Sequence, residues 1–192
     1  EQNGDPELGE VVVATGGLEP AFDPDDGDIN CYWWWSFGPF DDRPSEFFDV
    51  YLDKVRTQPD VVFCLSERCQ DIVESRNIDS LYLPLGTASF RPLHLHRDGI
   101  GYAGSKGHKN KRQVENLFGQ YREDDEFEWV DSLVTPTQLN LWYNTREATF
   151  GLTREGQREY GMVNNRVFET LASGTPLILE PHDNVNTTLG FT

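Results

Sequence analysis

Apolar residues in this chain come in short runs that alternate with segments of helical spacing. Four runs in the first half, VVVAT, INCYWWWSF, VVFCL and SLYL, have the length and the aromatic or β-branched content of strands. Between them, residues 45–55 and 67–76 show helical spacing of apolar positions, with Ser45 and Ser66 as the expected N-caps. Strands that alternate with helices in this way predict a parallel sheet with crossover helices.

The same alternation restarts in the second half of the chain. Strands are expected in GIGYAGS, FEWVDS, ATFGLT and TPLILEP, and helices in KNKRQVENLFGQY, TPTQLNLWYN and VNNRVFETLAS. Thr135 is the expected N-cap of the second of these helices, and Asn164 or Asn165 that of the third. Gly174 is expected to end the third helix, and residues 182–192 to form a loop.

The predicted fold class is therefore α/β, with two Rossmann-like units, each a parallel sheet with crossover helices. We expect the first unit in residues 1–90, a connector in 91–98 and the second unit in 99–192. In the tryptophan-rich strand, alternation sends Trp33 to one face of the sheet and Trp34 to the other. Burial in the core is the leading interpretation of these side chains.

Charge and composition exclude some classes of partner. The formal net charge of −17 argues against binding to nucleic acid, whose phosphates the protein would repel. No apolar run approaches the length of about 20 residues that a membrane-spanning helix needs, so no transmembrane segment is expected. The three cysteines match no zinc-site spacing, which favours buried, reduced thiols and a cytoplasmic location.

One basic stretch, GSKGHKNKR, stands out in this acidic chain. It holds three of the four lysines, follows a predicted strand and opens a predicted helix. Backbone N–H groups and the helix dipole at such a point, together with the basic side chains, suit the binding of phosphates. The alternative is a solvated basic turn that offsets nearby acids, and spacing leaves both interpretations open. The candidate residues are Gly104, Ser105, Lys106, Lys109 and Arg112.

A second candidate site lies in the last predicted helix. Arg166 and Glu169 are three residues apart, so they are neighbours on one side of that helix. They form either an exposed ion pair or a grip on the hydroxyls and phosphates of a ligand. The spacing does not decide between these two alternatives.

The stretch RVFETLASGTPLILE resembles the family motif of GT-B glycosyltransferases of the group-1 type. In that motif a helix that carries a Glu, and that ends in a Gly-x-Pro sequence, runs into an apolar strand. PLG, FRP, GYAGS and Arg112 precede it in the order typical of the branch that includes spore-maturation proteins. The resemblance covers about residues 60–182, and we expect the chain to be a fragment or a shortened member. Gly161 stands where many group-1 members carry an earlier Glu.

The resemblance implies a two-domain GT-B fold that binds a nucleotide-diphosphate-sugar donor on residues 99–192, while residues 1–90 serve the acceptor side. Glu169 would accept hydrogen bonds from the ribose hydroxyls, and Arg166 would lie near the diphosphate with the basic turn. Asn165 belongs to the same predicted donor site. Neither a bound metal nor a cofactor is expected, because side chains and a helix dipole steady the leaving diphosphate. A catalytically idle module that binds a nucleotide sugar or a glycan is the alternative.

The acceptor side carries the remaining candidates. Asp41, in the loop after the tryptophan-rich strand, is the candidate general base, with a solvated acidic turn as the alternative. His182, the second candidate catalytic residue, follows the last strand, at the edge where open α/β sheets bind ligands, and its imidazole is expected to contact the donor or the acceptor. The acceptor, whether glycan, lipid or protein, is left open. The aromatic acceptor-side candidates are Trp35, Phe37 and Phe40.

Overall fold

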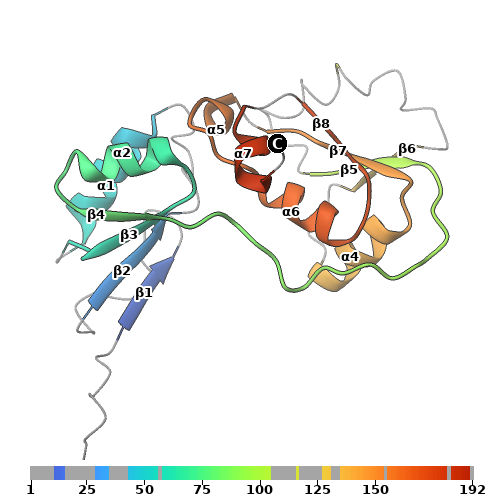
Figure 1. Ribbon diagram of the computed structural model, residues 1–192, viewed down its shortest axis with the longest axis horizontal. Helices are drawn as coiled ribbons and strands as arrows, with labels where there is room; N and C mark the ends of the chain where they lie inside the picture. Colours follow the sequence, from blue (N-terminus) through green and yellow to red (C-terminus); the bar gives the residue numbers. More distant parts are fainter. Residues whose placement is uncertain are drawn as a thin grey trace, which may run out of the picture. The chain divides into compact units, whose positions relative to one another are not determined.

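The computed structural model divides into two compact units, each with a four-stranded sheet (Figure 1). Unit 1 comprises residues 1–84 and 155–162, and unit 2 comprises residues 85–154 and 163–192. In both sheets every strand pair is parallel, which confirms the predicted α/β class with parallel sheets and is compatible with two Rossmann-like units. The structure describes residues 11–15, 29–34, 43–55, 58–104, 116, 127–130, 135–153, 155–180 and 183–190.

Unit 1 has the strand order β1-β2-β3-β4, so neighbours in the sheet are also neighbours in the chain. Two helices, α1 and α2, cross over between successive strands, and a short helix, α5, joins this unit from later in the chain. The bounds are β1 Val11–Thr15, β2 Ile29–Trp34, α1 Pro44–Lys54, β3 Val61–Cys64, α2 Glu67–Glu74, β4 Asp79–Tyr82 and α5 Glu155–Glu159.

The core of unit 1 is an aromatic layer between β2 and α1. Tyr32 stacks on Tyr51 with ring centroids 3.8 Å apart, and Trp34 stacks on Phe48 at 4.9 Å. All four of these side chains are fully buried, whereas Trp33 lies on the other face of the sheet and is half-buried. The expected alternation of Trp33 and Trp34 is confirmed, because successive side chains of a strand point to opposite faces.

The cysteines behave as the composition predicts within this unit. Cys31, Cys64 and Cys69 are buried and free, and burial raises the pKa of the Cys69 thiol to about 12. Such thiols are protonated and unreactive at neutral pH. They contribute to the core of unit 1 as small apolar side chains.

The two helices of unit 1 begin in different ways. Ser66 caps α2 as predicted, since its hydroxyl accepts from the backbone N–H of Cys69 at 3.2 Å. The prediction that Ser45 caps α1 is wrong: Arg43 is the N-cap residue, and it makes no side-chain capping bond. Pro44, whose φ is fixed near the helical value, starts α1 two residues earlier than a Ser45 cap would and leaves Ser45 inside the first turn.

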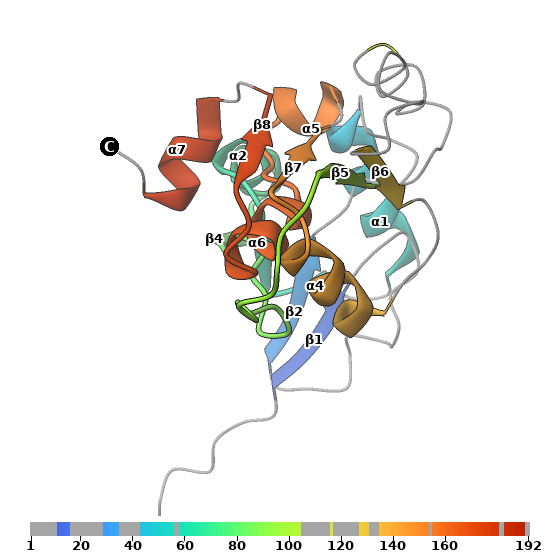
Figure 2. The same ribbon diagram turned by 90° about the vertical axis from the view of Figure 1, so that its right-hand side faces the viewer.

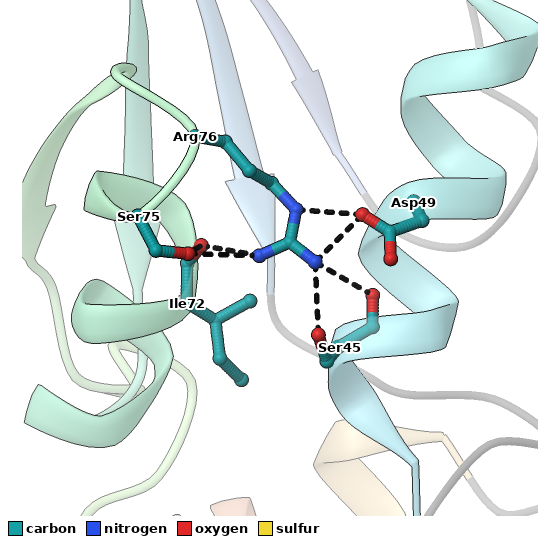
Figure 3. A network of polar contacts seen from close by, with 5 residues as sticks. All are labelled: Ser45, Asp49, Ile72, Ser75 and Arg76. Carbon is teal, nitrogen blue, oxygen red and sulfur yellow. Dashed lines mark hydrogen bonds and ion pairs between the residues drawn. The ribbon is translucent and has the colours of Figure 1, made fainter.

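Arg76 uses that displaced serine to join the two helices (Figure 3). Its guanidinium donates to the Ser45 hydroxyl at 2.8 Å and to Asp49 Oδ1 at 2.6 Å, both on α1. On its own side it donates to the carbonyl of Ile72 at 2.6 Å, near the end of α2. The guanidinium also lies over the Phe48 ring, 5.7 Å from its centroid. One cation therefore fixes α1 against α2 through the first turn of α1.

Unit 2 has the strand order β6-β5-β7-β8. The helix α6 packs against β7 and β8 and lies between α4 and α7 in both views (Figures 1 and 2). Thr135 caps α4 with a complete capping box, as predicted. The bounds are β5 Ile100–Ala103, β6 Phe127–Val130, α4 Pro136–Asn144, β7 Ala148–Gly151, α6 Asn165–Ala172, β8 Leu177–Leu179 and α7 Asp183–Leu189.

The end of the chain differs from the sequence expectation of a loop after β8. The helix α7 forms there, and its Val185 and Leu189 pack against Val163 and Val167 at the start of α6. Two apolar residues four apart lie on one side of a helix, and this pairing gives α7 an apolar stripe to bury. That spacing was the signal for a helix in this segment.

The connector after β4 is fastened to unit 2 by buried amides. Asn140 accepts from the backbone N–H of Arg91 at 3.0 Å, and Asn144 accepts from that of Leu93 at 2.7 Å. The Asn144 amide also donates to the carbonyl of Arg91 at 3.0 Å, and Ser173 donates to Asn140 at 2.9 Å. The extended segment around Pro92 thus finds on α4 the hydrogen bonds that a neighbouring strand would otherwise supply.

In the described part of the chain, none of the helices is both long enough and apolar enough to span a membrane.

Candidate functional site

The candidate site is built on α6, which begins after β7 and α5. Asn164 is the N-cap, one of the two residues expected, and its side chain accepts from the backbone N–H of Arg166 at 3.0 Å. Because α6 leads from β7 to the parallel strand β8, its N-terminus lies at the carboxyl edge of the sheet. Open α/β sheets bind their ligands at that edge.

The other end of α6 closes with the predicted glycine. Gly174 has φ +67°, and the N–H of Thr175 donates to the carbonyl of Thr170 at 3.2 Å, which is a Schellman motif. A Cβ on Gly174 would make a tight contact of 3.2 Å with the Pro92 ring, and the positive φ itself favours glycine at this position. This closure sets where α6 ends.

Glu169 occupies the middle of α6 and is half-buried. Its Oε1 accepts from the Asn165 amide at 3.0 Å, one turn earlier on the same helix. Its Oε2 accepts from the Tyr143 hydroxyl at 3.4 Å, which comes from α4. Each carboxylate oxygen therefore has one protein donor and keeps further acceptor capacity, since an ionised carboxylate accepts at about four positions.

Opposing effects act on the protonation of this carboxyl. Burial is the largest effect and raises the pKa of Glu169, while the Arg166 guanidinium and the hydrogen bonds from Tyr143 and Asn165 lower it. The net direction is upward. A carboxylate that is half-buried yet surrounded by a cation and two donors is a candidate for ligand binding, because such groups gather at functional sites.

Tyr143 is the buried member of this group, with 1% of its surface exposed. Burial raises the pKa of Tyr143 to about 12, with Arg166 lowering it and Glu169 raising it further. The phenol is therefore protonated at neutral pH and available to donate to Glu169. Arg166, Glu169 and Tyr143 act on one another across α4 and α6, and we name them together with Asn165 the Glu169 cluster.

Gly104, the only predicted member of the basic turn that the structure describes, follows β5 at the carboxyl edge of the sheet. Its N–H donates to the carbonyl of Val130 at 2.9 Å, and its carbonyl accepts from the Trp129 indole at 2.9 Å. A Cβ there would collide with the Tyr102 ring. Gly104 therefore ends β5 at the carboxyl edge of the sheet. The start of α6 lies at the same edge, because β5 and β7 are parallel.

Of the predicted site residues, the structure brings together Asn165, Arg166 and Glu169 and places Gly104 at the same edge of the unit 2 sheet. Their roles in binding stay predictions. The other predicted site residues lie outside the described residues and keep their predicted roles: Trp35, Phe37, Phe40, Asp41, Ser105, Lys106, Lys109, Arg112 and His182.

Sequence reasoning missed Tyr143. Helical spacing in TPTQLNLWYN indicates which side of α4 is buried, but the partner of the hydroxyl depends on which helix packs against α4. A tyrosine at a buried helical position is a signal that its O–H seeks a partner. The sequence alone does not say that this partner is Glu169.

Comparison with protein-family models and with curated proteins finds no match to this chain. Among the residues that the structure describes, no group of three or more His, Cys, Asp or Glu side chains has an arrangement that could hold a metal ion. Metal independence stays a prediction, as does the GT-B assignment.

Proposed function

We propose that this protein is a GT-B-type glycosyltransferase that moves a sugar from a nucleotide-diphosphate-sugar donor to an acceptor. The observation that carries the proposal is the half-buried Glu169 carboxylate on α6, held by Asn165 and Tyr143 beside the Arg166 cation. This arrangement lies in a parallel α/β unit, on the helix that the family motif designates for the ribose. The motif and the geometry thus point to the same side chain.

The chemistry of the donor matches this cluster in two respects. A ribose offers two adjacent hydroxyls, and a carboxylate with acceptor capacity on both oxygens can accept from both. Arg166 supplies a cation for the diphosphate, where the predicted basic turn of residues 104–112 would add others. Cations and backbone N–H groups that meet a leaving diphosphate stabilise the charge that develops on it without a metal ion.

In the transfer step, an acceptor hydroxyl oxygen forms a bond to the anomeric carbon while the bond from that carbon to the diphosphate oxygen breaks. The diphosphate leaves with the electron pair of the broken bond, and the hydroxyl proton passes to a base. Asp41 is the predicted base if the enzyme inverts, and His182 is the predicted contact to donor or acceptor. In this proposal the Glu169 cluster belongs to the donor half of the scheme.

The test is a panel of UDP-, GDP- and dTDP-sugars, with binding followed by thermal shift and calorimetry and turnover by release of the nucleoside diphosphate. Glu169→Ala is expected to weaken donor binding by about 1–3 kcal/mol, the range for a hydrogen bond to a charged group. Glu147→Ala is the matched control, because Glu147 is an exposed carboxylate of the same unit. Wild-type protein that binds none of the panel would refute the proposal.

A second candidate function, binding without turnover, rests on Gly161. This residue stands at the place of the earlier family Glu, is buried, and has φ +73°, which favours glycine and strains a side chain. A catalytically idle module would bind a nucleotide sugar through the Glu169 cluster and release no diphosphate. Measured turnover with any acceptor excludes this candidate, whereas binding without turnover of donor by the full-length protein supports it.

A further inference from the structure

We propose that Tyr143 is a positioning residue for ligand binding: its hydroxyl holds the Glu169 carboxylate in the orientation in which the remaining lone pairs meet a pair of ligand hydroxyls. The inference rests on the proposed function, since the ligand hydroxyls are those of the donor ribose. It assigns a role to a side chain of α4, a helix that carries none of the predicted site residues.

The Tyr143 ring is fixed from several directions. The Tyr143 backbone carbonyl accepts from the Thr175 hydroxyl at 2.7 Å, just beyond the end of α6, and the ring lies 6.0 Å from that of Phe90, just before the connector. The side chain is buried to 1% exposure. A phenylalanine ring would fill the same space, so packing does not require the hydroxyl. The hydroxyl contributes only through its hydrogen bonds to polar neighbours.

Those neighbours make the hydroxyl a link between two helices. It donates to Glu169 Oε2 at 3.4 Å, and Thr170 and Arg166 also interact with it. The bond to Glu169 is long, and hydrogen bonds of this kind often tighten only when a ligand is bound. A buried, protonated donor aimed at a half-buried carboxylate fixes the plane of that carboxylate more firmly than an exposed donor does.

Asn165 and Tyr143 have different exposures, and this difference assigns their roles. The Asn165 side chain is exposed, so a ligand hydroxyl can take its place on Oε1. The Tyr143 hydroxyl is buried behind Glu169 and stays on Oε2 while a second ligand hydroxyl uses the other lone pair of that oxygen. Tyr143 is therefore the permanent partner and Asn165 the exchangeable one.

The role has a pH signature, because protonation turns one oxygen of the carboxylate into a hydrogen-bond donor, so only the ionised form accepts from a diol on both oxygens without a competing O–H. The described side chains that face Glu169 come from α6 itself, with Arg166 and Asn165, and from α4, whose only titratable side chain is Tyr143. The strands β7 and β8 and the described side chains of α7 carry no charged group. Removing the Tyr143 hydroxyl takes away one of the effects that lower the pKa of Glu169.

The first experiment measures affinity for the tightest-binding nucleotide sugar of the panel as a function of pH, with the complete chain. In Tyr143→Phe we expect affinity at neutral pH to fall about three- to tenfold, and the loss of affinity on acidification to start at a higher pH than in wild type. The matched control is Tyr51→Phe, which removes a buried hydroxyl of unit 1 for which the described structure has no partner. A Tyr143→Phe profile equal to that of wild type would overturn the proposal.

The second experiment needs no ligand, and it separates this proposal from the proposed function. Carbon-13 NMR follows the titration of the Glu169 carboxyl, which is assigned by its absence from Glu169→Gln. Tyr143→Phe is expected to raise the pKa of Glu169 above its wild-type value, and Tyr51→Phe to leave it unchanged. An unchanged pKa in Tyr143→Phe would refute the positioning role. If Tyr143→Phe raises the pKa of Glu169 but the wild-type protein binds no nucleotide sugar, the proposed function is refuted. The link between Tyr143 and Glu169 then still holds.

Discussion

The two units fasten their helices with different chemistry. In unit 1 a charged side chain, Arg76, joins α1 to α2, and its partner Asp49 is 58% exposed. In unit 2 neutral amides, Asn140 and Asn144, join α4 to the connector, and both are buried. Exposed ion pairs are screened by salt, whereas buried neutral hydrogen bonds are not. The joint between α4 and the connector in unit 2 is thus built without charge, although the same unit also holds an ion pair between Arg146 and Glu128 at 3.3 Å.

The largest expected effect breaks the neutral joint. Asn144→Ala leaves the N–H of Leu93 and the carbonyl of Arg91 without their buried partner, and we expect unfolding free energy to fall by about 2–4 kcal/mol. Urea unfolding followed by tryptophan fluorescence measures this loss, with the exposed Asn186→Ala as the control. The loss should be the same at 0.1 and at about 1 M NaCl, because the joint carries no charge. A loss that disappears with salt would contradict the assignment.

A smaller, salt-dependent effect is expected for the charged joint. Arg76→Met keeps an apolar side chain near the Phe48 ring but removes the bonds to Ser45 and Asp49, and a loss of about 1–2 kcal/mol is expected. The part due to Asp49 should shrink as salt is added. The same urea titration tests this, and a loss independent of ionic strength would show that the hydrogen bonds to Ser45 and Ile72 act alone.

Much of the fold follows from periodicity and caps in the sequence. The strands are short apolar runs, and Ser66, Thr135 and Gly174 mark helix ends through local chemistry that needs no tertiary contact. The start of α1 was misjudged because Pro44 competes with Ser45 as the first-turn signal. The helix α7 was missed because its two apolar residues, Val185 and Leu189, stabilise a helix only when they can pack against α6.

The candidate site divides in the same way. Asn165, Arg166 and Glu169 share one side of a single helix, so three- and four-residue spacing is enough to group them. Tyr143 joins them only through the packing of α4 on α6, which brings its hydroxyl to the Glu169 carboxylate. Spacing within a helix is readable from the sequence, whereas a partner on another helix is not.

A still smaller effect compares two buried tyrosines. Tyr51 has a buried hydroxyl for which the described part of the chain offers no hydrogen-bond partner, and Tyr143 has Glu169. Removing an unpaired buried hydroxyl relieves a desolvation penalty, so Tyr51→Phe should leave stability unchanged or raise it by up to about 1 kcal/mol. The test compares the midpoints of thermal unfolding of Tyr51→Phe and Tyr143→Phe with that of wild type. A clear destabilisation by Tyr51→Phe would mean that its hydroxyl has a partner after all.

The smallest expected change in stability is a gain at neutral pH, for Glu169→Gln. Because the folded-state pKa of Glu169 is raised, the folded protein binds its proton more tightly than the unfolded chain does. The stability that this proton contributes is complete below the unfolded-state pKa and is lost as pH rises through the folded-state pKa. Glu169→Gln keeps an amide in place of the protonated acid, so it should be as stable as wild type at low pH and slightly more stable at neutral pH.

The same variant should bind nucleotide sugars more weakly, since a neutral amide offers one acceptor atom where the carboxylate offers two. A gain in stability joined to a loss in binding is the expected behaviour of a residue kept for a ligand at the expense of the fold. Unfolding midpoints and donor affinity, each measured across the acid to neutral range, give both halves of this test. If Glu169→Gln instead lowers stability at neutral pH, the carboxylate belongs to the joints of unit 2, like Asn140 and Asn144, and the contrast between the two roles disappears.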